Sequence, residues 1–202
     1  EHARIFVAHM TCDGTFDVPL FPVVDTAPGD QWYAALAVQR DRLLVLWQDS
    51  RQTDSPQVRL SFRVFGLDGT PLTEATEMIP PGFDSPPSTM WFHRVVPSGV
   101  DGFLAAGVWA SPDAQRFQVF TQQLGPDGLP RMIDGTPDPI RDLDPAPLIN
   151  QGQPGLANGP YDIKYLAWPR AADDEDWVVH MTTLTPGLDR TDPEVPIAAG
   201  SG

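Results

Sequence analysis

Leu-Leu-Val-Leu-Trp-Gln-Asp-Ser-Arg at residues 43–51 and Val-Arg-Leu-Ser-Phe-Arg-Val-Phe-Gly-Leu-Asp-Gly at residues 58–69 decide the fold. Both stretches contain short runs rich in Val, Leu and Phe, and the link between them is polar, with one proline and no glycine. Such runs are typical of β-strands rather than helices. Asp68-Gly69 is typical of a tight turn in which the glycine has a positive φ. The stretch therefore predicts a strand, a loop, a second strand and a turn.

The composition extends this prediction to the whole chain. It has 202 residues, with 13 Lys and Arg against 27 Asp and Glu, and a formal charge of −14. This charge repels a phosphate backbone, so we expect no nucleic-acid partner. No apolar run is long enough to cross a bilayer, so we expect no membrane span. The 23 prolines and 17 glycines interrupt every candidate helix, which predicts an all-β fold.

The same order of strands and turns recurs along the chain. We expect one all-β repeat domain over residues 1–202, made of a leading hairpin (1–30) and three repeats (31–80, 89–140 and 146–198), with a linker at 80–88. Each repeat is expected to have four strands. The predicted strands lie at residues 3–8, 18–24, 32–38, 43–47, 58–66, 73–79, 91–96, 102–109, 117–124, 132–133 or 139–140, 153–157, 163–168, 177–184 and 195–198.

Two alignments support the repeats. The tryptophan that closes the second strand falls at Trp47, Trp109 and Trp168, at intervals of 62 and 59 residues. The turn falls at Asp13-Gly14, Asp68-Gly69 and Asp127-Gly128, at intervals of 55 and 59 residues, with Pro186-Gly187 in the last repeat. We interpret the tryptophans as packing residues between neighbouring repeats.

Repeated four-stranded units predict a β-propeller-like array of antiparallel blades. The leading hairpin and three repeats amount to about three and a half blades, whereas a propeller needs about four to close. The half blade therefore completes a small ring within the chain, pairs with another chain, or belongs to a longer propeller. Because an unpaired strand edge is a template for association, we expect a protein partner or self-association.

The repeats resemble those of secreted bacterial proteins, many from myxobacteria and their relatives, that carry tandem propeller repeats. Their pattern is Gln-x-x-Pro-x-Leu-Ala, then a strand ending in Trp-x-Asp-x-Arg, then Asp-Gly-Thr. Here it is matched by Trp47, Asp49 and Arg51, by residues 68–70 and by residues 153–157. The resemblance implies an extracellular or cell-surface location and brings no common activity. The second and third repeats lack the Trp-Asp-Arg set, so we interpret it as a local brace.

Acidic residues follow the second strand of each repeat, at Asp49, Asp113 and Asp173. On one rim of a propeller they could act as general acid and base, or bind calcium. Alternatively they are solvated loop carboxylates, since turns favour Asp. With Arg51, which we expect to form a loop ion pair with Asp49, they are the candidate binding residues. The acidic run at 173–176 lacks the spacing of a calcium loop.

Other reactive residues give no recognised site. His2, His9, His93 and His180 lack chelate spacing, so metal binding would depend on the fold, and Cys12 has no partner for an internal disulfide. No nucleophile elbow, phosphate loop or dinucleotide fingerprint is present. We therefore expect no cofactor, with calcium left open.

The function expected from the sequence is a non-catalytic extracellular structural or interaction module. It would bind a protein partner, itself or a surface glycan through propeller rims and open strand edges. The alternative is a propeller-type glycoside-active enzyme that uses rim carboxylates such as Asp49 and Asp113.

Overall fold

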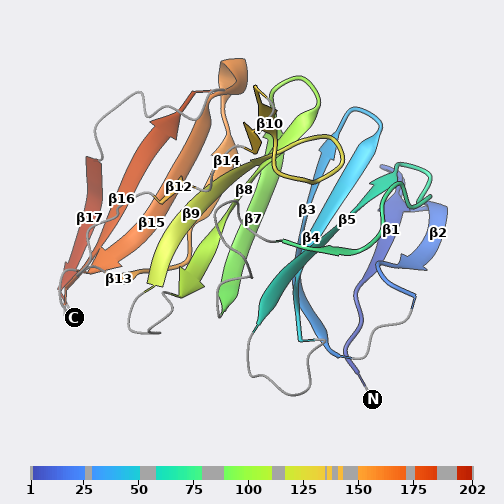
Figure 1. Ribbon diagram of the computed structural model, residues 1–202, viewed down its shortest axis with the longest axis horizontal. Coiled ribbons are helices and arrows are strands. Elements are labelled where there is room, and N and C mark those ends of the chain that lie inside the picture. The colour runs from blue at the N-terminus through green and yellow to red at the C-terminus, as the bar shows by residue number, and fades with distance from the viewer. Residues whose placement is uncertain are drawn as a thin grey trace.

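The structure is a computed structural model in which antiparallel β-sheets follow one another in chain order (Figure 1). It describes residues 2–25, 29–50, 58–78, 89–110, 117–134, 136–137, 141–142, 150–171, 176–185 and 195–201. Within these ranges the only helix is a single 3₁₀ turn, η1 (Pro160–Asp162), and no helix is long and apolar enough to cross a membrane. The prediction of an all-β fold is confirmed.

Three larger sheets and two hairpins make up the described chain. The first sheet has the order β3 (Gln31–Gln39), β4 (Arg42–Asp49), β5 (Arg59–Gly66), β6 (Thr76–Glu77). The second sheet has the order β7 (Met90–Ser98), β8 (Gly102–Ala110), β9 (Phe117–Leu124), β12 (Arg141–Asp142). The third sheet contains β13 (Asn150–Gln151) and β14 (Gly155–Asn158), which both pair with β15 (Lys164–Ala171), then β16 (Asp176–Leu184) and β17 (Val195–Ser201). The N-terminal hairpin is β1 (Phe6–Met10) with β2 (Phe16–Pro22), and a smaller hairpin is β10 (Met132–Ile133) with β11 (Thr136–Pro137).

Consecutive sheets pack face to face, and β4 shows why. Successive side chains of a strand point to opposite faces. Leu44 enters the core shared with the second sheet, whereas Val45 and Trp47 enter the core shared with the N-terminal hairpin. A third core, which includes Trp168, joins the second and third sheets. A strand that is covered on both faces has a continuous run of apolar residues, as found at residues 43–47.

The aligned tryptophans do not all occupy equivalent positions. In each sheet the first strand bulges away from the second, and the single residue opposite the bulge is Trp47, Gly107 or Trp168. Trp109 lies two residues farther along β8, so the sequence alignment of the second repeat is wrong by two residues. The Phe120 ring takes the place of an indole, since a Cβ on Gly107 would lie 2.9 Å from it. Trp47 and Trp168 are fully buried and face the preceding hairpin or sheet, which confirms their predicted packing role.

The sequence misplaced several short strands. The strands of the N-terminal hairpin lie at 6–10 and 16–22 instead of 3–8 and 18–24, and β6 at the edge of the first sheet has two residues instead of seven. Residues 132–133 pair with β11, so the fourth strand of the second sheet is β12, and the first strand of the third sheet is split into β13 and β14. Two-residue strands are too short to show a period in the sequence. Residues 139–140, the predicted linker at 80–88 and the turn at 186–187 lie outside the described residues.

The Asp-Gly turn recurs three times with the same backbone hydrogen bonds. The N–H groups of Thr11, Gly66 and Gly125 each donate to the carbonyl four residues later, at 2.8 Å. The turn glycines donate back at 3.0–3.1 Å, and their φ angles are +86° at Gly14, +83° at Gly69 and +79° at Gly128. The predicted positive φ is therefore confirmed. The N-terminal hairpin reproduces the third and fourth strands of a larger sheet, including the turn between them.

The turn aspartates are held by hydrogen bonds that favour their ionised form. The backbone N–H and hydroxyl of Thr70 both donate to Asp68 at 2.9 Å, which lowers the pKa of that carboxyl. Hydrogen bonds from Thr11 and Thr15 lower the pKa of Asp13 to about 2. These aspartates therefore act as turn-forming residues.

Gly128→Ala is expected to lower the free energy of unfolding more than Gly14→Ala does. Both substitutions force a Cβ into the left-handed region, which costs about 1–2 kcal/mol. At Gly128 the added carbon would also lie 2.6 Å from the Phe62 ring and 3.0 Å from Leu44, whereas at Gly14 nothing lies within 4 Å. Such overpacking adds about 1–3 kcal/mol. Urea unfolding of the two variants measures these decreases in the free energy of unfolding. Equal decreases would show that the contact between the Gly128 turn and the first sheet does not affect stability.

Candidate functional site

Asp49 is the one predicted site residue in the described part of the chain, and Arg51, Asp113 and Asp173 lie outside it. Asp49 ends β4, is buried, and accepts a hydrogen bond from Trp47 Nε1 at 3.1 Å. The prediction that Asp49 is a solvated loop carboxylate is therefore wrong, because β4 extends two residues beyond the predicted strand. The contact with Trp47 agrees with the interpretation of these two residues as a local brace.

A different set of residues comes together where the three first strands bulge. In each sheet two residues of the first strand oppose one residue of the second, and these pairs are Tyr33-Ala34, Phe92-His93 and Gln153-Pro154. A bulge of this kind disrupts pairing locally and redirects a side chain. β3 contacts β7, and β7 contacts β14. The equivalent bulges of three sheets therefore lie next to one another.

The bulges enclose a cavity of about 220 Å³, which we call the bulge cavity. It is lined by Tyr33, Ala34, Gln48, Phe92, His93, Arg94 and Gln153. These residues supply two aromatic rings, two amides, an imidazole and a guanidinium, and they include no carboxylate. Each of the three larger sheets contributes, so the cavity exists only when these sheets are packed together.

Two aromatic side chains at the bulge cavity are held in strained, exposed positions. Tyr33 has φ +50° and Phe92 has φ +54°, a conformation that costs a non-glycine residue about 1–2 kcal/mol. The side chain of Tyr33 is 75% exposed and that of Phe92 44% exposed. Because both rings remain exposed to solvent, their burial contributes little stability to offset the cost of the strained backbone. Such outliers cluster at binding sites, where surrounding structure maintains them.

His93 is a buried neutral base at the wall of the bulge cavity. Its Nε2 lies 2.9 Å from the carbonyl oxygen of Leu46, and because a carbonyl only accepts, Nε2 carries the proton. Burial lowers the pKa of His93 to about 4, the charge of Arg94 adds to the shift, and the backbone groups of Leu46 and Tyr33 oppose it. Nδ1 is then a hydrogen-bond acceptor that lies near the backbone of Tyr33 and makes no hydrogen bond of normal geometry within the described chain.

The protein is expected to lose stability between pH 6.5 and pH 4 because of His93. In this window the unfolded chain binds a proton at an ordinary imidazole, whereas the folded chain does not until pH falls to about 4. The loss amounts to about 3 kcal/mol from this one residue. His93→Gln should reduce the pH dependence of the urea midpoint. Equal pH dependence in the wild type and the His93 variant would contradict this expectation.

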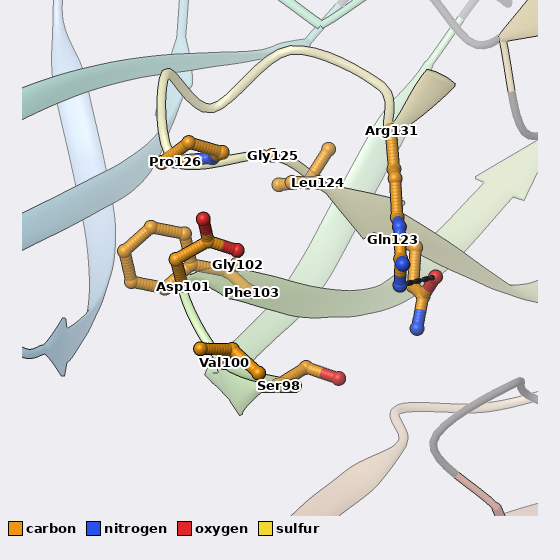
Figure 2. Close-up of a pocket in the computed structure, with 11 residues that line it drawn as sticks. Ser98, Val100, Asp101, Gly102, Phe103, Gln123, Leu124, Gly125, Pro126 and Arg131 are labelled. Carbon is orange, nitrogen blue, oxygen red and sulfur yellow. Dashed lines mark hydrogen bonds between the residues drawn. The ribbon is translucent and has the colours of Figure 1, made fainter. Parts of the chain in front are cut away.

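A larger hollow of about 380 Å³ lies at one end of the second sheet (Figure 2). It is formed by the turn between β7 and β8 and by the turn that follows β9, and Phe103 and Leu124 also line it. Figure 2 shows Arg131 extended beside Gln123, to whose Oε1 it donates from Nη1 at 3.2 Å. Because a single sheet forms this hollow, and Arg131 is already engaged, the bulge cavity is the stronger candidate.

Histidine and acidic side chains do not gather into a metal site in the described ranges. No group of three His, Cys, Asp or Glu residues there could hold an ion. His93 contacts the first sheet, and the His180 ring stacks on Trp168 with a centroid distance of 6.2 Å. Calcium binding at Asp113 or Asp173 stays a prediction.

The sequence contained a signal for the bulge cavity that the tryptophan alignment obscured. Gln31-Trp32-Tyr33, Met90-Trp91-Phe92 and Gln151-Gly152-Gln153 are equivalent, at intervals of 59 and 61 residues. Gln31 and Gln151 are buried, and their Oε1 atoms accept from the backbone N–H groups of Ile5 and Val119 in the preceding units. An alignment on these glutamines would have brought the bulges of the first and third sheets into register, and Trp32 and Trp91 relate the first sheet to the second.

Comparison with protein-family models and with curated proteins identifies no relative. No protein-family model matches the chain, and no curated protein matches it. The resemblance to tandem propeller repeats therefore stays a prediction.

Proposed function

We propose that the chain is a non-catalytic extracellular interaction module built as a β-propeller-like array. In this proposal the three sheets are consecutive blades, the N-terminal hairpin is the outer half of another, and open strand edges and rims bind a protein partner, a second copy or a surface glycan. The face-to-face order of the sheets and their equivalent bulges and turns support this arrangement. The resemblance to secreted repeat proteins is the basis for the extracellular or cell-surface location.

The observation that carries the proposal is the incomplete covering of the N-terminal hairpin. In the first sheet, β5 pairs with β4 on one side and β6 on the other. Its counterpart β1 pairs only with β2 among the described strands. Within the described part of the chain, the edge of β1 that corresponds to the β4 side of β5 has no strand beside it, and such an edge is a template for another strand.

A comparison of equivalent side chains shows what such a strand would cover. Val95 on β7 is 7% exposed because it lies in the core against the first sheet. The equivalent residue on β3, Leu36, is 56% exposed. Leu36 lines an apolar hollow of about 230 Å³ with Val7, Phe21, Val38 and Leu43. Strands added to the β1 edge would cover Leu36 as the first sheet covers Val95.

Light scattering after size-exclusion chromatography tests the proposal. We expect concentration-dependent association of the wild-type chain, and its loss in Leu36→Lys, because a charge in the apolar hollow opposes its covering. Leu129→Lys is a matched control, since Leu129 is similarly exposed but lies in the turn after β9. Association that persists in the Leu36 variant would contradict a role for this edge. A monomeric wild type that binds no glycan would contradict the interaction module itself.

The alternative of a glycoside-active enzyme gains nothing from Asp49, which is buried and accepts a hydrogen bond from Trp47. A screen for polysaccharide hydrolysis with Asp49→Asn as comparison tests that alternative. Unchanged activity in the variant would remove Asp49 from the mechanism.

A further inference from the structure

We propose that the bulge cavity binds a single sugar ring of a glycan. The proposal rests on the proposed role of the chain as a non-catalytic binding module, and it names the ligand and the site. Three features of the cavity support it: its rings, its polar groups and its size.

The exposed rings fit the apolar faces of a sugar. A pyranose presents C–H groups on its faces and hydroxyls around its edge, so an aromatic ring with one free side suits it. Tyr33 and Phe92 are equivalent residues of neighbouring sheets, and both lie exposed at the cavity. Their strained backbone places the two rings there at a cost to the fold.

The polar groups at the cavity fit hydroxyls. A sugar hydroxyl both donates and accepts, and it needs partners of both kinds. Neutral His93 supplies an acceptor, because Nε2 donates to Leu46 and Nδ1 makes no hydrogen bond of normal geometry in the described chain. Gln48 and Gln153 each bring an amide that donates and accepts, and Arg94 brings further donors. A buried acceptor without a partner is costly, and a ligand hydroxyl would satisfy it.

The size of the cavity favours one ring over a longer ligand. Its volume of about 220 Å³ is smaller than the roughly 300–1,000 Å³ typical of sites for drug-sized ligands. A side chain of a peptide would fill the space, but it would leave the ring of polar groups without matching hydroxyls. The terminal residue of a glycan fits both the volume and the polar lining.

Binding of the full chain to an array of immobilised glycans with different terminal sugars, neutral and acidic, tests the proposal. Titration calorimetry with the free monosaccharide of the best ligand then gives the affinity. We expect Tyr33→Ala to weaken binding about tenfold, the loss expected from one aromatic contact. Gln153→Ala should also weaken binding. Tyr161→Ala is the matched control, because Tyr161 is 92% exposed and lies on η1, outside the cavity lining, and this variant should bind as the wild type does.

Two results would overturn the proposal. One is a wild-type chain with the circular dichroism of a β-protein that binds none of the sugars at millimolar concentration. The other is sugar binding that Tyr33→Ala leaves unchanged. Light scattering separates this proposal from the previous one, because Tyr33→Ala should associate as the wild type does. Loss of sugar binding with intact association would support the site, and loss of association in Leu36→Lys with intact sugar binding would support both proposals independently.

Discussion

Replacing Trp47 with alanine is expected to lower the free energy of unfolding by about 3–5 kcal/mol, the range measured for large aromatic residues in cores. Trp47 is fully buried between the first sheet and the N-terminal hairpin, where it packs with Val23, Val45 and Phe65. Its removal leaves a cavity at a junction between two packed units, and it removes the Nε1 donor from buried Asp49. Urea unfolding followed by circular dichroism measures the loss.

Two further variants separate the causes. Trp47→Phe keeps most of the apolar contact but loses the N–H donor. It should therefore lower the free energy of unfolding less than Trp47→Ala does, because the alanine variant also leaves a large cavity. Trp177→Ala removes an indole on β16 that is 41% exposed, and it should cost less than Trp47→Ala. If Trp47→Ala and Trp177→Ala were equally mild, the face-to-face packing of hairpin and first sheet would be wrong.

Asp162→Ala is expected to cost up to about 3 kcal/mol, the low end of the range for a buried ion pair, because Lys164 is buried but Asp162 is partly exposed. The Lys164 side chain is 1% exposed, and its Nζ donates to the Asp162 carboxylate and, at 3.1 Å, to the Asp162 carbonyl. The other carboxylate oxygen accepts the N–H of Gly99 at 2.8 Å, from the β7–β8 turn. The alanine variant therefore leaves the buried Lys164 ammonium without its counter-charge. It also removes the hydrogen bond between Gly99 and Asp162 that links the second sheet to the third.

The double variant Asp162→Ala, Lys164→Met provides the test of this cause. It replaces the pair by apolar groups, which is often neutral or stabilising, so most of the lost stability should return. Lys164→Met alone should cost less than Asp162→Ala, because Asp162 is partly exposed and water can solvate it. A double variant as unstable as Asp162→Ala would show that the buried charge was not the source of the loss.

The distribution of apolar residues explains why much of the fold could be predicted from the sequence. β4 and β8 lie where residues 43–47 and 102–109 predicted strands, because these central strands are buried on both faces and appear as unbroken apolar runs. The Asp-Gly turns were readable for a local reason, since only glycine adopts their positive φ without strain. Edge strands such as β6 and β12 pair on one side and span two residues, so they left no comparable pattern.

The bulge cavity could not be predicted in the same way, because its residues are brought together only by packing. Tyr33, Phe92 and Gln153 lie on three different sheets and share no residue type. The sequence predicted that Asp49 would be a solvated loop residue, and the two-residue extension of β4 buries it instead. Whether Asp49 is buried or solvated depends on where β4 ends. The pattern of apolar and polar residues in the sequence locates the ends of strands poorly.

The sequence by itself determined the all-β fold, the positions of the central strands and the three Asp-Gly turns, because apolar continuity and glycine conformation are properties of short segments. Only the tertiary structure decided which residue lies opposite each bulge, so that Gly107 rather than Trp109 matches Trp47 and Trp168. It also decided that His93 is a buried neutral base and that Leu36 is exposed where Val95 is covered. These properties depend on register and on the neighbouring sheet, which place together residues about sixty positions apart in the chain.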